Sequence, residues 1–153
     1  EQNIEYDLFD FSELFEYENE QKYDALKTVN LVSALTKNNG VKEKVITDTY
    51  IQGNKLSIST NGIYTGTAFY QEEDFILQDS ISVSLKNKEL NKYIGMYLIT
   101  VINYENFRFD YGRKSGKSRL NRLKLRLPIN DYGNPDYDYM ERYIKTLEFS
   151  KYI

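Results

Sequence analysis

The most regular hydrophobic pattern in the chain lies between residues 88 and 104. Apolar side chains recur there at the spacing of one helical face: Leu90, Tyr93, Ile94, Tyr97, Leu98, Val101 and Ile102. Asn87 stands just before this stretch and has the short polar side chain of an N-cap residue. The pattern therefore predicts a helix over about residues 88–104, with one face packed on the core.

The first half of the chain carries shorter signals. Leu56 and Ile58 alternate with polar residues and predict a strand, and so do residues 67–70 and 80–85. Before about residue 55 the pattern is weak. Residues 12–15 predict one helical turn, residues 28–32 a strand, and Asn39-Gly40 a turn.

Two elements are predicted after the helix. Leucines at 123, 125 and 127 alternate with Lys124 and Arg126, which indicates a strand with a charged outer face that ends at Pro128. A second helix is expected from Asn134, with Asn134 as its cap and Pro135 in its first turn. Its apolar stripe consists of Met140, Tyr143, Ile144 and Leu147.

Together these elements predict an α+β fold: one domain with a mixed, mostly antiparallel β-sheet, a packed central helix and a C-terminal helix. A length of 153 residues suits one domain. No apolar run reaches the ~18 residues of a membrane span, and the acidic start EQNIEYDLFDF lacks the apolar region of a signal peptide. With no cysteine in the chain either, we expect a cytoplasmic protein without membrane contact.

The composition excludes several kinds of chemistry. The chain has no histidine and no cysteine, which removes Ser–His and Cys–His nucleophile pairs and thiolate metal sites. No phosphate-binding loop of the form GxxxxGK[ST] occurs. We therefore predict no catalytic residues, no metal and no cofactor.

The catalytic alternative is a metal-dependent nuclease or another carboxylate-based DNA enzyme. Glu20-Gln21-Lys22 has the E-x-K spacing of such enzymes, with Asp7 and Asp10 upstream. Matches of this kind are common by chance in an acid-rich segment. Asp136 and Asp138 fit the start of a helix better than a metal site.

Positive charge is concentrated in one segment. Five of the six arginines and three lysines lie between Arg108 and Arg126, where Asp110 is the only acid, in a chain whose net charge is −3. Arginine pairs bidentately with phosphate or with a guanine edge. An acidic protein with one arginine-rich segment is typical of a nucleic-acid binder. The alternatives are a basic face paired with the acidic N-terminal third, and an interaction protein that binds an acidic partner.

The candidate DNA contacts fall in two groups. The basic group includes the stretch 111–117, which contains two glycines. Its members are Arg108, Tyr111, Arg113, Lys114, Lys117, Arg119, Arg122 and Lys124. The second group lies in the loop 61–66, where Asn61 pairs with adenine in one interpretation and Tyr64 stacks on a base. The other interpretation of this loop is a hairpin turn that needs glycine. Asn38 and Asn39 are a weaker case of the same kind.

Several segments, taken in order, resemble a known family. They are NGIYTGTAFYQEEDFILQDSISVSL (61–85), LNKYIGMYLITVI (90–102), FDYGRKSGKSRL (109–120), LKLRLPI (123–129) and GNPDYDYMERYIKTLEFS (133–150). This ordered set is similar to the target recognition domain of the DNA-specificity subunit of type I restriction-modification systems. The same domain also occurs in type IIG and IIB restriction enzymes.

The resemblance implies a function and a division of the chain. Residues 1–133 would form the recognition domain, and residues 134–153 would begin the spacer helix that separates two such domains. Each domain of the family reads one half of a bipartite duplex DNA target and is not catalytic itself. The implied partners are an adenine methyltransferase subunit and a restriction subunit, with self-association through the C-terminal helix as a further possibility.

Overall fold

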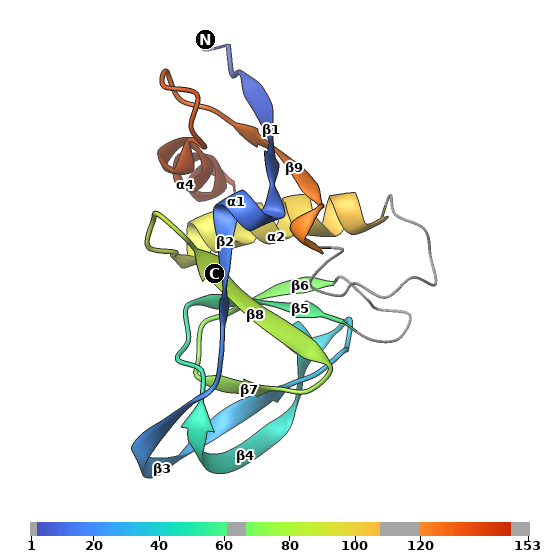
Figure 1. Cartoon of the computed structure of the whole chain (residues 1–153), viewed down its shortest axis with the longest axis vertical. Helices are drawn as coiled ribbons and strands as arrows, with labels where there is room; N and C mark the ends of the chain where they lie inside the picture. The colour runs from blue at the N-terminus through green and yellow to red at the C-terminus, as the bar shows by residue number, and fades with distance from the viewer. Residues whose placement is uncertain (1–2, 61–66, 108–119, 148–153) are drawn as a thin grey trace.

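The centre of the molecule is a four-stranded antiparallel sheet. The computed structural model describes residues 3–60, 67–107 and 120–147. Within these residues the sheet has the order β2-β8-β5-β6 (Figure 1). Its strands are β2 (Phe15–Glu18), β8 (Ser80–Leu85), β5 (Lys55–Ser59) and β6 (Ala68–Gln71). The strands predicted around residues 56–58, 67–70 and 80–85 are thus confirmed.

One face of this sheet packs on helix α2 (Lys92–Phe107), which lies across the middle of the molecule (Figure 1). Leu56 pairs in register with Val83, and Ile58 with Ile81, so their side chains point to the same face. Ile94, Leu98 and Ile102 of the helix have no exposed surface and belong to the same core cluster. The predicted apolar stripe is therefore the buried face of the helix.

The helix begins later than predicted. The side-chain oxygen of Asn91, not of Asn87, accepts hydrogen bonds from the backbone N–H groups of Tyr93 and Ile94, at 3.0 and 2.9 Å. Leu90, the first residue of the predicted stripe, precedes the helix but is still buried. Leu90 lies in the segment that leads into the helix, and its side chain is buried there. Its spacing from the helical residues therefore made the predicted helix begin too early.

A two-stranded antiparallel sheet joins the beginning of the chain to its last third. It pairs β1 (Tyr6–Asp10) with β9 (Lys124–Pro128). Leu125 and Leu127 are fully buried while Lys124 and Arg126 are exposed, as the alternation predicted. The predicted early helical turn is confirmed as α1 (Phe11–Leu14), which follows β1 directly.

The last described helix, α4 (Tyr137–Thr146), also begins later than predicted. Asp136 is its N-cap and accepts a hydrogen bond from the Tyr139 N–H at 3.0 Å, so the assignment of Asn134 as cap was wrong. Pro135 instead forms a β-bridge with Ile129, which keeps the chain extended just before the helix. The helix ends at Thr146, its C-cap residue Leu147 is extended, and Met140 and Ile144 are its buried residues.

A third sheet lies at the other end of the molecule (Figure 1). This distal sheet has the order β4-β3-β7 and consists of β3 (Gln21–Val32), β4 (Val41–Tyr50) and β7 (Phe75–Leu77). β3 and β4 form an antiparallel hairpin, and β7 runs parallel to β3. The strand predicted at residues 28–32 is the inner end of β3, and the predicted turn is the 3-10 turn η1 (Asn38–Gly40).

The predicted α+β class with mostly antiparallel strands is confirmed. In the part of the chain that the structure describes, the strands are divided among three sheets instead of one. None of the helices seen there is both long and apolar enough to cross a membrane.

Candidate nucleic-acid interface

Only two of the ten predicted DNA-contact residues lie in the described part of the chain, Arg122 and Lys124. The other eight fall outside the described residues. They are Asn61, Tyr64, Arg108, Tyr111, Arg113, Lys114, Lys117 and Arg119. The framework that carries these two segments can nevertheless be examined.

Arg122 is exposed and lies in a turn that is fixed by a hydrogen bond and by buried neighbours. Leu120 and Leu123 on either side of it are 2% exposed, and the Leu123 N–H donates to the Leu120 carbonyl at 2.9 Å. Asn121 in the same turn accepts a hydrogen bond from the Tyr17 hydroxyl at 2.9 Å. Burial raises the pKa of Tyr17, so this hydroxyl stays a neutral donor. Arg122 is thus presented to solvent by a turn fixed to both the core and β2.

Lys124 already has a partner within the chain. Its Nζ lies 2.7 Å from Asp10 Oδ1 across the β1–β9 sheet, and this contact raises the pKa of Lys124. Its neighbour on the same face, Arg126, stacks over the Tyr6 ring at 4.8 Å. For these two residues the alternative of a basic face paired with the N-terminal segment describes the structure better than a free DNA-binding face.

The base of the 61–66 segment is closed by hydrogen bonds between β5 and the residue before β6. The Ser59 N–H donates to the Thr67 carbonyl at 2.9 Å. The Thr67 N–H in turn donates to Ser59 Oγ at 3.1 Å. Ser59 and Thr67, which flank residues 61–66, are therefore held together.

The start of β6 is also bound to the last part of α2. The Ala68 N–H donates to Asn103 Oδ1 at 2.7 Å, and Asn103 Nδ2 donates to the Ala68 carbonyl at 3.0 Å. Ala68 comes two residues after the 61–66 segment, and Asn103 five residues before the 108–119 segment. In Figure 1 the end of α2 and the adjoining ends of β5 and β6 lie on the same side of the molecule. The framework thus brings together the points at which both candidate segments are attached.

The weaker candidates, Asn38 and Asn39, are occupied within the fold. Both have positive φ, at 55° and 54°, as turn residues often do. Asn39 Nδ2 donates to the Tyr70 carbonyl at 2.8 Å, and Asn38 Nδ2 to the Val41 carbonyl at 2.9 Å. The turn interpretation therefore accounts for both side chains.

The acids of the nuclease alternative do not come together. Asp7 and Asp10 lie on β1, whereas Glu20 precedes β3, which belongs to a different sheet. The Glu20 carboxylate accepts a hydrogen bond from the Leu77 N–H at 3.0 Å. Among the described residues, no group of three or more acids is arranged to hold a metal ion. The geometry gives the nuclease alternative no support.

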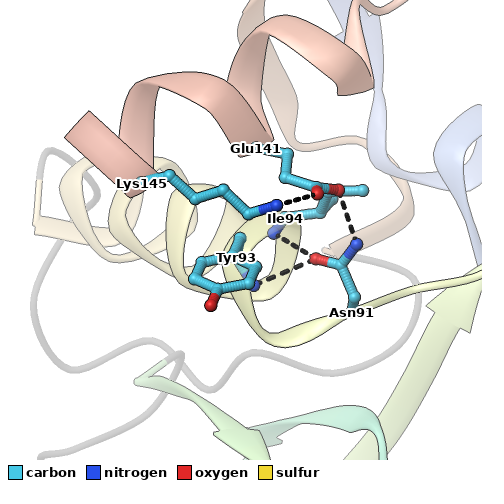
Figure 2. A network of polar contacts seen from close by, with 5 residues as sticks. All are labelled: Asn91, Tyr93, Ile94, Glu141 and Lys145. Atoms are coloured by element: carbon cyan, nitrogen blue, oxygen red, sulfur yellow. Dashed lines mark hydrogen bonds and ion pairs between the residues drawn. The ribbon is translucent and has the colours of Figure 1, made fainter. Parts of the chain in front are cut away.

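A polar network that the sequence did not reveal joins the start of α2 to α4 (Figure 2). Glu141 accepts a hydrogen bond from Asn91 Nδ2 at 2.7 Å and pairs with Lys145 Nζ at 2.7 Å. The hydrogen bond from Lys145 has the larger effect and that from Asn91 the smaller, and both lower the pKa of Glu141. The N-cap residue of α2 therefore also fixes α4, at the end of α2 away from Asn103.

Asn103 was missed for a physical reason. It is the residue after Ile102 in a helix whose apolar stripe dominates the pattern, and a single half-buried amide leaves no periodic signal. The role of the Asn103 amide becomes visible only in the structure, where it bonds the backbone of Ala68.

Comparison with known proteins points to one family. The sequence profile of the family described as "Type I restriction modification DNA specificity domain" matches residues 4–153. The chain is 27% identical over 121 residues to the "Type II restriction enzyme BgcI specificity subunit S.BcgI" of Heyndrickxia coagulans. That match covers 78% of this chain and 36% of the relative.

Solved structures share the fold. The S subunit of a type I restriction-modification system from M. genitalium superposes with a TM-score of 0.59 at 14% identity, over 96% of this chain and 41% of that one. The HsdS subunit from Thermoanaerobacter tengcongensis superposes with a TM-score of 0.60 at 10% identity, over 96% and 37%. The chain thus spans only about two fifths of these structures' length.

Proposed function

The chain belongs to the family of type I restriction modification DNA specificity domains, and we propose that it reads one half of a bipartite target in duplex DNA. In this proposal it carries out no chemistry itself. It holds the DNA for an adenine methyltransferase subunit and a restriction subunit, which modify or cut it.

The observation that carries the proposal is the common attachment of the two candidate segments. Asn103 joins the strand that follows residues 61–66 to the helix that precedes residues 108–119. The second segment contains three of the chain's six arginines, and Arg122 just beyond it is exposed. A surface that reads DNA needs cations for phosphates beside groups for base edges, and this arrangement supports both at one end of the framework.

We assign the DNA contacts accordingly. Phosphate and base contacts come from the basic segment and from the 61–66 loop: Arg108, Tyr111, Arg113, Lys114, Lys117, Arg119, Arg122, Asn61 and Tyr64. Lys124 is a weaker member of this set because it is already paired with Asp10.

The C-terminal part is proposed to serve assembly. Residues 1–133 form the recognition domain in this proposal, and residues 134–153 begin the spacer. The described helix α4 buries Met140 and Ile144 but leaves Tyr143 44% exposed. Such a half-buried helix face supports docking of a further subunit or a second copy.

Salt dependence of DNA binding tests the main proposal. If about five phosphates are engaged, the slope of log affinity against log salt should be near −4.5. Lys117→Ala with Arg119→Ala should weaken binding, as measured by fluorescence anisotropy with a labelled duplex. The matched control is Lys42→Ala with Lys44→Ala, which removes two exposed lysines from the distal sheet. Salt-independent binding, or equal loss in both double variants, would contradict the proposal.

Absence of turnover tests the non-catalytic part. The purified chain should neither cleave DNA with Mg²⁺ nor methylate it with S-adenosylmethionine. Activity that survives purification and disappears on Glu20→Gln would show that the chain is an enzyme.

A further inference from the structure

Among the described residues β6 is an edge strand, so half of its backbone groups have no strand partner there. The backbone groups of Thr67 and Gln71 bond toward β5: the Thr67 carbonyl accepts the Ser59 N–H at 2.9 Å and the Gln71 carbonyl accepts the Asn54 N–H at 2.7 Å. Because backbone groups alternate in direction along a strand, those of Ala68 and Tyr70 point away from the sheet. In the described sheet β6 has no neighbour on that side.

Two asparagine side chains occupy this open edge. Asn103 bonds both the N–H and the carbonyl of Ala68, as a neighbouring strand would do. Asn39 bonds the carbonyl of Tyr70 at 2.8 Å. An amide side chain carries the same donor and acceptor as a peptide group, so asparagine can replace a missing strand partner.

The Asn103 contact cannot be replaced easily by solvent. Ala68 is fully buried against α2, in the same core cluster as Ile102. A buried backbone N–H or carbonyl without a partner is costly, so the pair of hydrogen bonds holds β6 and α2 in one relative position. Asn39 protects the other end of the same strand, away from the 61–66 segment.

We propose that Asn103 is a positioning residue for sequence-specific DNA recognition: its amide fixes the start of β6 to the last part of α2, so that the two points of the framework at which residues 61–66 and 108–119 are attached keep one relative position when DNA is read. This inference rests on the proposed function of the chain. It assigns the amide a role in specificity that goes beyond protection of a strand edge.

The inference distinguishes two kinds of DNA binding. Phosphate contacts tolerate small displacements, because a cation attracts a phosphate over several ångströms. Contacts with base edges require hydrogen-bond geometry. Loss of the Asn103 amide should therefore lower specific binding far more than non-specific binding.

The experiment compares two duplexes and three proteins. One 30-base-pair duplex carries a site selected by the 153-residue chain from a random library, and the other carries that site scrambled. The proteins are the unchanged chain, Asn103→Ala, and Asn39→Gly. Asn39→Gly is the matched control, since it removes an amide from the same strand edge while glycine keeps the positive φ at that position.

We expect Asn103→Ala to reduce the ratio of specific to non-specific affinity by about tenfold, the low end of what one bidentate base contact contributes. The salt slope on the scrambled duplex should stay unchanged. Asn39→Gly should keep the ratio within about twofold, even where thermal unfolding shows a similar loss of stability. An unchanged ratio in Asn103→Ala, or an equal drop in Asn39→Gly, would overturn the positioning role.

A second variant guards against a folding defect. Asn103→Asp keeps the acceptor for the Ala68 N–H but replaces the donor to the Ala68 carbonyl by a second carboxylate oxygen, so its ratio should fall below that of the unchanged chain. If Asn103→Ala does not fold, the test rests on Asn103→Asp. A ratio of specific to non-specific affinity equal to that of the unchanged chain would then reject the inference. If the unchanged chain selects no site, the proposed function fails and the inference fails with it. A selected site with an unchanged ratio in the variants refutes the inference alone.

Discussion

The two ends of the molecule, on either side of the central sheet, differ in how they bury apolar surface. On the α2 side, Ile94, Leu98 and Ile102 are fully buried in a cluster that takes in residues from β1 to α4. On the other side, the distal sheet has a separate small core of Val32, Ile51 and Phe75. The outer part of its hairpin buries little, and Leu26 and Ile46 are 70% and 71% exposed.

Polar contacts of Asp74 join the segment before β7 to the distal hairpin and to the segment before β5. Asp74 accepts the Gly53 N–H at 2.8 Å and also pairs with Lys27. Gly53 itself lies so close to the 72–73 backbone that a Cβ there would be 2.1 Å from the Glu72 carbonyl oxygen. The difference indicates that the α2 side sets global stability, whereas the distal sheet has a small apolar core and depends more on polar contacts such as those of Asp74, and so opens more easily.

The largest effect is expected from Leu98→Ala. Removing this fully buried side chain should lower the free energy of unfolding by about 2–5 kcal/mol. Urea denaturation monitored by circular dichroism measures the change. Leu26→Ala is the matched control and should change stability by less than about 0.5 kcal/mol. Equal losses at the two positions would invalidate the contrast between the two ends.

Gly95→Ala should give the next largest effect. A Cβ at this position would lie 2.6 Å from Cδ1 of the Tyr70 ring, at the contact between α2 and β6. Overpacking of this kind costs about 1–3 kcal/mol, and the helix propensity gained with alanine, up to about 1 kcal/mol, offsets only part of it. Tyr70→Ala should be less harmful in the Gly95→Ala background than alone. If the losses of stability from the two substitutions simply add, the Tyr70 ring does not limit how closely α2 and β6 approach.

Asp74→Ala tests the joint of the distal sheet. It leaves the Gly53 N–H without its acceptor, at an expected local cost of about 1 kcal/mol. Hydrogen exchange should show faster exchange in the distal sheet, while α2 stays protected. Asp24→Ala, which removes an exposed acid from the same hairpin, should change neither. Uniformly faster exchange across the molecule would instead show that the joint is part of the global unfolding unit.

The same joint predicts a pH dependence. Burial alone would raise the pKa of Asp74, but the hydrogen bonds from Lys27 and from the Gly53 N–H outweigh it, and the pKa is lowered in the folded chain. The unfolded chain therefore binds the proton more readily. The stabilisation is complete above the ordinary aspartate pKa of about 3.9 and is lost as the pH falls through the lower folded value. Protection factors in the distal sheet, which correct for the intrinsic pH dependence of amide exchange, should fall over that range, and Asp74→Ala should abolish this fall.

The smallest effect is expected from Ile46→Thr on the outer hairpin. Because the side chain is mostly exposed, stability should change by less than about 0.5 kcal/mol. The same substitution at Ile58, which is fully buried, places an additional hydroxyl in the core and should cost about 1–3 kcal/mol. Thermal unfolding of both variants provides the comparison. A large loss at Ile46 would reveal packing on the hairpin that its exposure does not suggest.

The contrast between the two ends also explains which elements the sequence could predict. Helix α2 and strand β9 bury one regular face each, so their periodicity is clear. The outer half of β3, from Gln21 to Leu26, has mostly exposed residues on both faces and a register shift, so no alternation marks it.

Other differences come from contacts between distant residues. Ser57 and Ser82 pair in register on the face of the sheet away from α2, yet both are buried. Their alternation with apolar residues predicts a strand, but it cannot show that the polar face is covered as well. The start of α4 was displaced by the bridge between Pro135 and Ile129. Local capping rules contain no information about such a bridge.

The candidate site was predicted by charge and not by geometry. The arginine clustering indicated the segment, but the ion pair that occupies Lys124 could not be foreseen, because Asp10 lies 114 residues away. Nor could sequence show that Asn103 bonds Ala68, 35 residues away along the chain, and so joins the attachment points of the two segments.

The pairing of β1 with β9 has a consequence for folding kinetics. Formation of this sheet closes a loop of more than a hundred residues, whereas β5, β6, β8 and α2 are neighbours along the chain. Because the entropic cost of closure grows with loop length, the β1–β9 sheet should form after the central sheet and α2. Substitutions at its contacts, such as Asp10→Ala, should then accelerate unfolding and leave the folding rate nearly unchanged. The contacts formed last would set how long the folded chain persists.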